Sequence, residues 1–185
     1  MPVSGKKTYI SLLRGINVSG QKMIKMSELA SLYESIGFGN VRTYVQSGNV
    51  IFESTINDPV KIQNKIEKGL EANFGYQVKV IIRTPDEIKE IIKKNPFIKK
   101  PGVDIIRLYV SFLSNVPAPA LLKDLTVNKK PSEEFKIIGK EVYLYMPEGF
   151  GTSKLQIGVF EKKLSTIATA RNWKTVNMLY ELSKS

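Results

Sequence analysis

The sequence contains neither cysteine nor histidine. Without thiols, the chain can form no disulfide, no thiolate metal site and no cysteine nucleophile. Without imidazoles, it has no histidine metal ligand, no Ser-His-Asp triad and no side chain that titrates near pH 7 at its ordinary pKa. We therefore expect no metal site and no cofactor, and we favour binding over catalysis.

Acidic residues are also scarce, with 17 Asp and Glu against 28 Lys and Arg, which gives a net charge of +11 over 185 residues. The excess is divided as +5 over residues 1–83 and +6 over residues 84–185, and no Lys/Arg run is longer than two residues. The charge therefore belongs to a folded surface and not to a disordered basic tail. Such a surface favours nucleic acid, a phosphorylated small molecule or an acidic partner.

Long hydrophobic runs are missing as well. The apolar run at residues 9–13 is too short for the core of a signal peptide. The uncharged stretch at residues 108–122 contains two prolines and is shorter than the roughly 20 residues that a membrane helix needs. We expect a cytoplasmic protein with no membrane association, and the oligomeric state stays open.

The first half shows periodicities and turn residues that predict the order β-α-β-β-α-β. The expected elements are strands at 8–13, 41–46, 50–53 and 78–83, and helices at 26–36 and 59–74. This order is that of the ferredoxin-like α/β-plait, in which two helices pack on one face of an antiparallel sheet.

The second half begins with a helix at 85–94 and then restarts a similar pattern. The strand at 108–113 echoes the one at 8–13, and the elements that follow are expected at 119–125, 135–138, 142–146, 153–164 and 172–182. We therefore predict an α+β fold with two tandem ferredoxin-like α/β-plait domains, residues 1–84 and 85–185. The second is expected to be a degenerate βαββαα copy, in which a helix replaces the last strand.

Two glycine-containing loops are candidates for anion binding. The loop at 14–22 carries Arg14, Asn17 and Lys22, and its amides near a helix start favour a phosphate or carboxylate. The loop at 147–154 carries Ser153 and Lys154, which could hold an oxyanion in the same way. The alternative interpretation is structural: the glycines of the first loop form turns, and a hydroxyl of the second caps a helix.

Two further segments contain aromatic and polar residues. Arg171 and Asn172 precede the only tryptophan, Trp173, which suits base stacking but also fits a helical core stripe. The hairpin at 44–52 lies where RNA-recognition motifs carry stacking aromatics, although only a faint echo of that motif is present. Its polar residues are equally typical of a hairpin turn.

Four ordered segments together resemble a bacterial protein family of unknown function. They are LLRGINV at 12–18, VRTYVQSGNV at 41–50, SKL at 153–155 and RNWKTV at 171–176. The resemblance covers nearly the whole chain and departs at Ser19, where a glycine is common. It implies two α/β-plait domains in tandem and no established activity, substrate or cofactor.

The resemblance also indicates which polar side chains recur together. They are Arg14, Asn17, Tyr44, Gln46, Ser47, Asn49, Ser153, Lys154, Arg171 and Asn172. Our hypothesis is that these side chains, with Lys22, converge on a polar anion-binding cleft between the domains.

The leading interpretation is a binding protein for a nucleic acid or a phosphorylated metabolite. One alternative is a transferase or hydrolase that acts on a phosphorylated or carboxylated substrate and stabilises an oxyanion with the same groups. A second alternative is an interaction module whose sheet edge or face pairs with a partner protein.

Overall fold

The computed structural model describes residues 5–185, which divide into two compact units. The first unit consists of residues 5–89 and 179–185, and the second of residues 90–178. The predicted domain boundary between residues 84 and 85 stays a prediction. No helix in the described part of the chain is long and apolar enough to cross a lipid bilayer.

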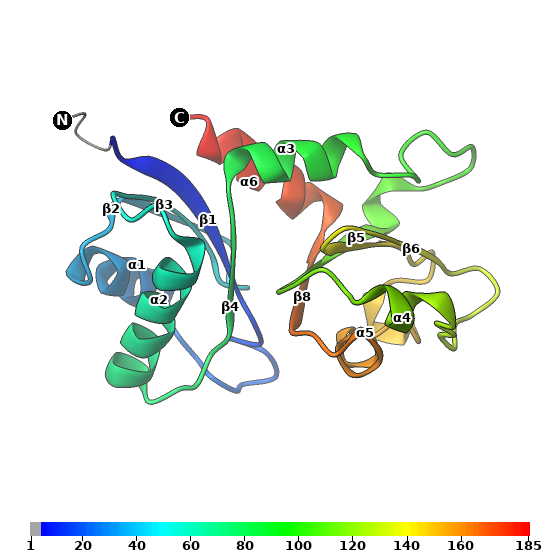
Figure 1. Ribbon diagram of the computed structural model, residues 1–185, viewed down its shortest axis with the longest axis horizontal. Coiled ribbons are helices and arrows are strands. Elements are labelled where there is room, and N and C mark those ends of the chain that lie inside the picture. The colour runs from blue at the N-terminus through cyan, green and yellow to red at the C-terminus, as the bar shows by residue number, and fades with distance from the viewer. Residues whose placement is uncertain (1–4) are drawn as a thin grey trace. The chain divides into compact units, whose positions relative to one another are not determined.

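The first unit is an antiparallel sheet with the strand order β2-β3-β1-β4 (Figure 1). Its elements in chain order are β1 (Lys7–Leu13), α1 (Met26–Ser35), β2 (Gly39–Tyr44), β3 (Asn49–Ser54), α2 (Pro59–Phe74) and β4 (Val80–Arg83). The predicted order of strands and helices in the first half is confirmed.

The local sequence explains why α2 forms where it does. Asp58 accepts a hydrogen bond of 2.9 Å from the Val60 amide, and Pro59 occupies the first helical position. Ile62 and Ile66 lie four residues apart on the buried face. Gly75, with φ of 72°, ends the helix in the left-handed conformation.

One face of the first sheet is covered by α1 and α2 (Figure 1). Tyr9 and Leu13 of β1 point into this core, together with Leu29 of α1 and Ile66 of α2. Residues i and i+4 of one strand lie on the same face, so the alternation of β1 selects these side chains.

The second unit has its own antiparallel sheet with the strand order β6-β7-β5-β8. Its elements in chain order are β5 (Leu108–Leu113), α4 (Pro119–Lys123), β6 (Glu134–Ile138), β7 (Glu141–Tyr145), α5 (Ile157–Leu164) and β8 (Ala168–Asn172). Two further helices are divided between the units: α3 (Pro85–Lys93) begins in the first unit, and the last turns of α6 (Trp173–Ser183) belong to it. Two short 3-10 helices cover Ile105–Arg107 and Phe150–Thr152.

The predicted replacement of the last strand by a helix is wrong, because β8 precedes α6. The sequence Ala-Thr-Ala-Arg-Asn has little intrinsic strand preference, because it contains one β-branched residue and no large apolar side chain. The segment is a strand because it pairs along its whole length with β5, from Ala168 opposite Leu113 to Asn172 opposite Tyr109. This tertiary pairing overrides local propensity, and the second half is a complete β-α-β-β-α-β unit followed by α6.

The two sheets repeat each other's pairing at corresponding positions. Ile10 of β1 lies opposite Arg83 of β4, and Val110 of β5 lies opposite Arg171 of β8. The pair Leu12 opposite Asn49 in the first sheet corresponds to Phe112 opposite Glu141 in the second. The pair Leu13 opposite Val80 corresponds to Leu113 opposite Ala168. The Leu13 amide donates to the Gly48 carbonyl, and the Leu113 amide donates to the Lys140 carbonyl.

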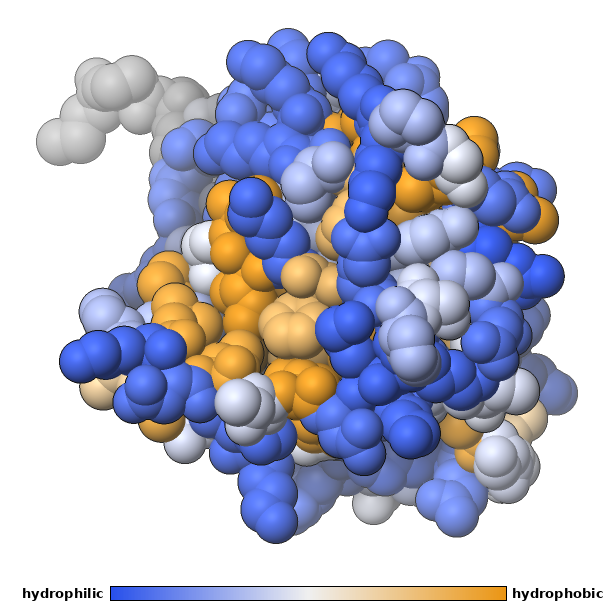
Figure 2. Space-filling model, turned by 90° about the vertical axis from the view of Figure 1, so that its right-hand side faces the viewer, coloured by the Kyte–Doolittle hydropathy of each residue, from blue (hydrophilic) through white to orange (hydrophobic). Residues whose placement is uncertain are grey.

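The surface is mostly hydrophilic, but hydrophobic residues reach it in places. Figure 2 shows the side that carries α4 and β6, where such residues gather among charged ones. In the second unit the exposed large hydrophobic residues include Ile105, Ile106 and Leu122. In the described part of the first unit the exposed large hydrophobic residues are Val18, Met23, Val45 and Val60.

Candidate functional site

The loop that follows β1 folds back on itself as a miniature hairpin. The Asn17 amide donates to the Lys22 carbonyl at 3.2 Å, and the Gln21 amide donates to the Val18 carbonyl at 2.9 Å. The two central residues, Ser19 and Gly20, have φ of 50° and 73°, which is the signature of a type I′ turn. Gly20 therefore serves a turn, as the structural interpretation of this loop expects.

The side chain of Asn17 joins this loop to the β2–β3 hairpin. Its Nδ2 donates to the Gln46 carbonyl at 2.8 Å and to the Ile24 carbonyl at 3.0 Å, and its Oδ1 accepts from the Ile24 amide at 2.8 Å. Asn17 itself has φ of 54°, a conformation that asparagine tolerates better than most residues. One side chain thus fixes both ends of the loop and the neighbouring turn.

The turn between β2 and β3, residues 45–48, is held from inside by Asn49. The fully buried Asn49 donates from Nδ2 to the Tyr44 carbonyl at 2.8 Å and to the Ser47 hydroxyl at 2.9 Å. Val45 has φ of 51°, which is a rare and strained conformation for a β-branched residue. We call residues 14–25 and 44–49 together the loop–turn end of the first unit.

The loop–turn end carries positive charge alone. Arg14 and Lys22 are half-buried, Lys25 is exposed, and neither segment contains an aspartate or glutamate. The ammonium group of Lys22 donates to the Gln77 carbonyl at 2.8 Å, which holds its side chain near the start of β4. Lys25 was not among the predicted residues; its only sequence signal is its position directly before a helix.

The structure brings seven of the predicted residues together at this end of the first sheet. They are Arg14, Asn17, Lys22, Tyr44, Gln46, Ser47 and Asn49. Asn17 and Asn49 act as supports, since their side-chain groups are engaged with the protein. Gln46 and Ser47 are exposed beside them.

The other predicted residues belong to the second unit, and two of them have structural roles. The Ser153 hydroxyl accepts from the Leu155 amide at 2.9 Å, and the Asn172 Oδ1 accepts from the Thr175 amide at 2.8 Å. Asn172 thus caps α6. Lys154 is exposed.

Arg171 is buried, with 6% of its surface exposed. One of its terminal nitrogens, Nη1, donates to the Thr169 hydroxyl at 2.7 Å and to the Ala170 carbonyl at 2.8 Å. Burial lowers the pKa of Arg171 to about 10, so the guanidinium keeps its proton at pH 7.

The segments that carry Ser153–Lys154 and Arg171–Asn172 lie at the same end of the second sheet. Tyr109 pairs with Asn172 across β5 and β8, and its ring contacts that of Phe150 with 5.4 Å between centroids. The convergence of all predicted residues on a single cleft stays a prediction.

The first sheet does not carry the stacking aromatics of an RNA-recognition motif. On the two central strands, the face opposite α1 and α2 presents the aliphatic residues Ile10, Leu12 and Ile51. The aromatic Tyr9 and Phe52 lie on the helix-covered face, in the core. The faint sequence echo of that motif therefore has no structural counterpart on these two strands.

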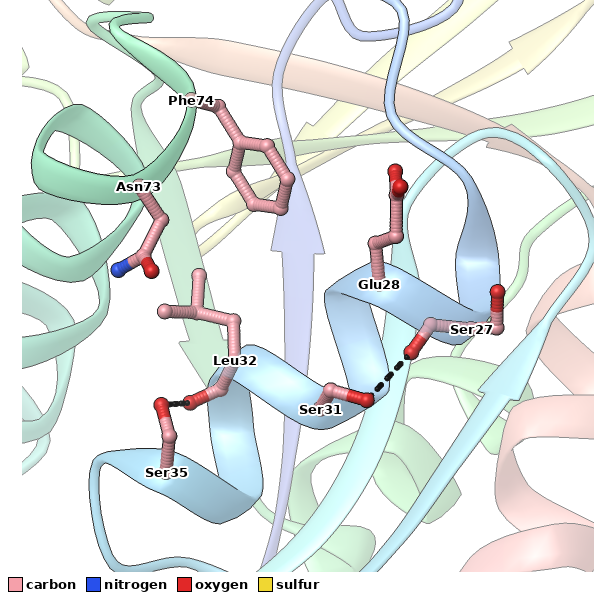
Figure 3. Close-up of a pocket in the computed structure, with 7 residues that line it drawn as sticks. All are labelled: Ser27, Glu28, Ser31, Leu32, Ser35, Asn73 and Phe74. Carbon is pink, nitrogen blue, oxygen red and sulfur yellow. Dashed lines mark hydrogen bonds between the residues drawn. The ribbon is translucent and has the colours of Figure 1, made fainter.

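Two cavities of the first unit have no predicted residue among their lining residues. The larger, about 430 Å³, lies between α1 and the end of α2 and is lined by Ser27, Glu28, Ser31, Leu32, Ser35, Asn73 and Phe74 (Figure 3). The hydroxyls of Ser31 and Ser35 donate to carbonyls of their own helix. The only sequence signal for this cavity is the spacing of its serines, four residues apart along α1.

The second cavity, about 290 Å³, lies beside α2 and the start of β4. It is lined by Asn64, Glu67, Lys68, Glu71, Gln77, Val78 and Lys79. Lys79 and Glu67 form an ion pair of 3.2 Å there. Within residues 5–185, no three His, Cys, Asp or Glu side chains gather closely enough to hold a metal ion.

These features define an α+β protein with two four-stranded antiparallel sheets, each with a helical layer on one face. The model of the family described as protein of unknown function DUF1697 matches residues 6–143, and the chain belongs to this family. No curated protein matches the chain.

The fold also resembles a solved structure, that of the conserved bacterial protein SP0830 from Streptococcus pneumoniae. The match has a TM-score of 0.72 at 19% sequence identity and covers 98% of this chain and 100% of the other. At this identity, the likeness shows the fold.

Proposed function

We propose that this protein is a binding protein that holds an anionic ligand at the loop–turn end of its first unit. The observation that carries the proposal is that Asn17 joins two distant segments. Their only charged residues are Arg14, Lys22 and Lys25, and neither segment contains a carboxylate. Cations on a prearranged surface raise the local concentration of an anion and its association rate. The ligand classes suggested by the sequence are a nucleic acid and a phosphorylated metabolite.

At the level of the fold, we propose that the two units are tandem ferredoxin-like α/β-plait domains that descend from one repeated unit. The shared strand order and the matching pairings of Arg83 and Arg171 support this. The cytoplasmic location expected from the sequence belongs to the same proposal.

The first test is a thermal-shift screen of the whole chain against nucleoside triphosphates, sugar phosphates, an oligothymidylate and a polyglutamate peptide. A ligand that binds only the folded state raises the melting temperature by mass action. Lys22→Gln combined with Lys25→Gln is expected to weaken the shift and its salt dependence. Glutamine keeps an amide donor but is one bond shorter than lysine, so the contact with Gln77 weakens, and circular dichroism verifies that the fold is retained.

The matched control is Lys162→Gln combined with Lys163→Gln on α5, which removes the same charge from two exposed residues of the second unit. This control is expected to keep nearly all of the shift. An equal loss in both variants would mean that only the overall charge of the protein acts, and the proposal would be wrong. A complete absence of shifts at low salt would also overturn it.

A further inference from the structure

Exposed hydrophobic side chains are concentrated on the loop–turn end. Of the four exposed large hydrophobic residues in the described part of the first unit, three lie on its two segments: Val18 at 58%, Met23 at 57% and Val45 at 46%. Single exposed hydrophobic residues are common on any surface, whereas a group of them marks an interaction site.

Each of these three residues is the chain neighbour of a group that Asn17 fixes, and we infer from this that they share one surface. Val18 follows Asn17, Met23 precedes Ile24, and Val45 precedes Gln46. The hydrogen bonds of Asn17 hold these segments together, and Lys22 and Lys25 lie one residue before and two residues after Met23 in the chain. The surface is both apolar and cationic.

The shape of this surface suits a macromolecule. Residues 18–21 of the hairpin are all exposed, and neither described cavity of the first unit is lined by a residue of the loop–turn end. Small metabolites are usually held in concave pockets. An exposed hairpin instead presents its side chains to a large partner.

The residue types on this surface favour a polypeptide over a nucleic acid. Strands of nucleic acid are held by stacking on exposed aromatic rings, and the only aromatic residue of these segments is the half-buried Tyr44. Aliphatic side chains instead match leucine-like side chains of a partner, and the lysines match its carboxylates.

We infer that the ligand of the loop–turn end is an acidic segment of a partner protein that also carries apolar side chains. This inference rests on the proposed anion binding and specifies its ligand. Carboxylates of the segment pair with Lys22 and Lys25, and its apolar side chains cover Val18, Met23 and Val45.

The test uses fluorescence anisotropy with three labelled probes: a peptide of alternating glutamate and leucine, the same peptide with serine in place of leucine, and an oligothymidylate. We expect the glutamate–leucine peptide to bind most tightly. Val18→Ser combined with Met23→Ser is expected to weaken it about tenfold, which corresponds to ~1.4 kcal/mol. The same variant is expected to leave the glutamate–serine peptide unchanged.

The matched control is Ile105→Ser combined with Ile106→Ser, which removes two exposed aliphatic residues from the second unit, 52% and 69% exposed. It is expected to leave all three affinities unchanged. Equal losses in the two variants, or equal binding of both peptides, would overturn the inference, because apolar contact at this site would then contribute nothing.

The outcomes also separate this inference from the proposed function. If the oligothymidylate or a sugar phosphate binds, and Lys22→Gln with Lys25→Gln weakens it, the proposed function holds and the acidic-segment inference is wrong. If the lysine variant weakens no probe, both are wrong. Circular dichroism of each variant verifies that its fold is intact.

Discussion

The two units share a scaffold and differ in the loops at one end of it. In the first unit, β1 is followed by the long loop at 14–25, and a four-residue turn joins β2 to β3. In the second unit, β5 is followed by residues 114–118, and only Gly139 and Lys140 join β6 to β7. The sheets pair alike, so the extra chain of the first unit is an addition to the shared scaffold. Its Ile16 and Ile24 are buried in the core, and the residues between them form the exposed hairpin to which we assign binding.

The largest expected effect is a loss of stability at the glycines of the two hairpin turns, which should differ between the two units. Gly48→Ala would place a Cβ 2.8 Å from both the Ile16 and Leu13 side chains, at a φ of 80°. Overpacking and the left-handed backbone together are expected to lower the free energy of unfolding by about 3 kcal/mol.

Gly139→Ala is the matched change in the second unit, and it is expected to cost only about 1 kcal/mol. The nearest atom to its added Cβ is the Glu141 carboxylate, 3.8 Å away, at a φ of 61°. Urea denaturation of both variants measures the difference. Equal losses would mean that the two hairpins are equally packed, against the structure.

The second comparison concerns two fully buried serines at corresponding positions of β1 and β5. Ser11 shares a hydrogen bond of 2.7 Å with the buried Tyr33 hydroxyl, whereas the Ser111 hydroxyl has no partner in the described chain. Ser11→Ala leaves Tyr33 unsatisfied and is expected to cost about 2 kcal/mol. Ser111→Ala removes a buried unpaired group and is expected to be neutral or stabilising, which thermal denaturation measures.

The third prediction concerns alkaline pH. Burial raises the pKa of Tyr33 well above the ordinary 10, and the hydrogen bond with Ser11 opposes this only in part. The folded state keeps the phenol proton that the unfolded chain loses above pH 10, so this stability is present below pH 10 and is lost as pH rises toward the folded pKa.

Tyr33→Phe removes this dependence and is expected to flatten the decline by ~1.4 kcal/mol per pH unit above 10. Tyr143 on β7 of the second unit is the comparison, because burial and the Glu141 charge also raise its pKa. Denaturation curves between pH 8 and 11 measure the slope for Tyr33→Phe and for Tyr143→Phe. An unchanged slope for Tyr33→Phe would show that this phenol ionises as readily in the folded protein as in the unfolded chain.

The smallest expected effect is a gain. Val45→Asn keeps the turn but suits its φ of 51°, so the melting temperature is expected to rise, with a gain of about 1 kcal/mol. Binding of the glutamate–leucine peptide is expected to weaken at the same time, because an exposed hydrophobic side chain is lost. A drop in stability would mean that Val45 makes packing contacts that outweigh its backbone strain.

The sequence predicts most of the fold because its core-facing residues recur at regular intervals. The Ile62 and Ile66 stripe and the Asp58 cap locate α2. The strand β8 is not predicted, because its extended conformation depends on pairing with β5, more than 50 residues earlier in the chain, and not on its own side chains.

The candidate site is predictable in its residues but not in its geometry. The motifs select Asn17 and Asn49, yet a motif does not say that one asparagine spans from Ile24 to Gln46. The sequence also does not predict the hydrophobic part of this surface, because Val18 and Val45 are of a residue type that is usually buried, and only the structure shows that they are exposed.

The bonds of Asn17 have a kinetic consequence. They fix the loop–turn end before any ligand arrives, so binding requires little ordering of the backbone. Changes in the hydrophobic side chains then act mainly on how long a complex lasts, whereas loss of the lysines also slows association. Loss of Asn17 acts differently: it lowers the fraction of molecules in the competent arrangement, and the apparent affinity falls in the same proportion even though every contacting side chain is still present.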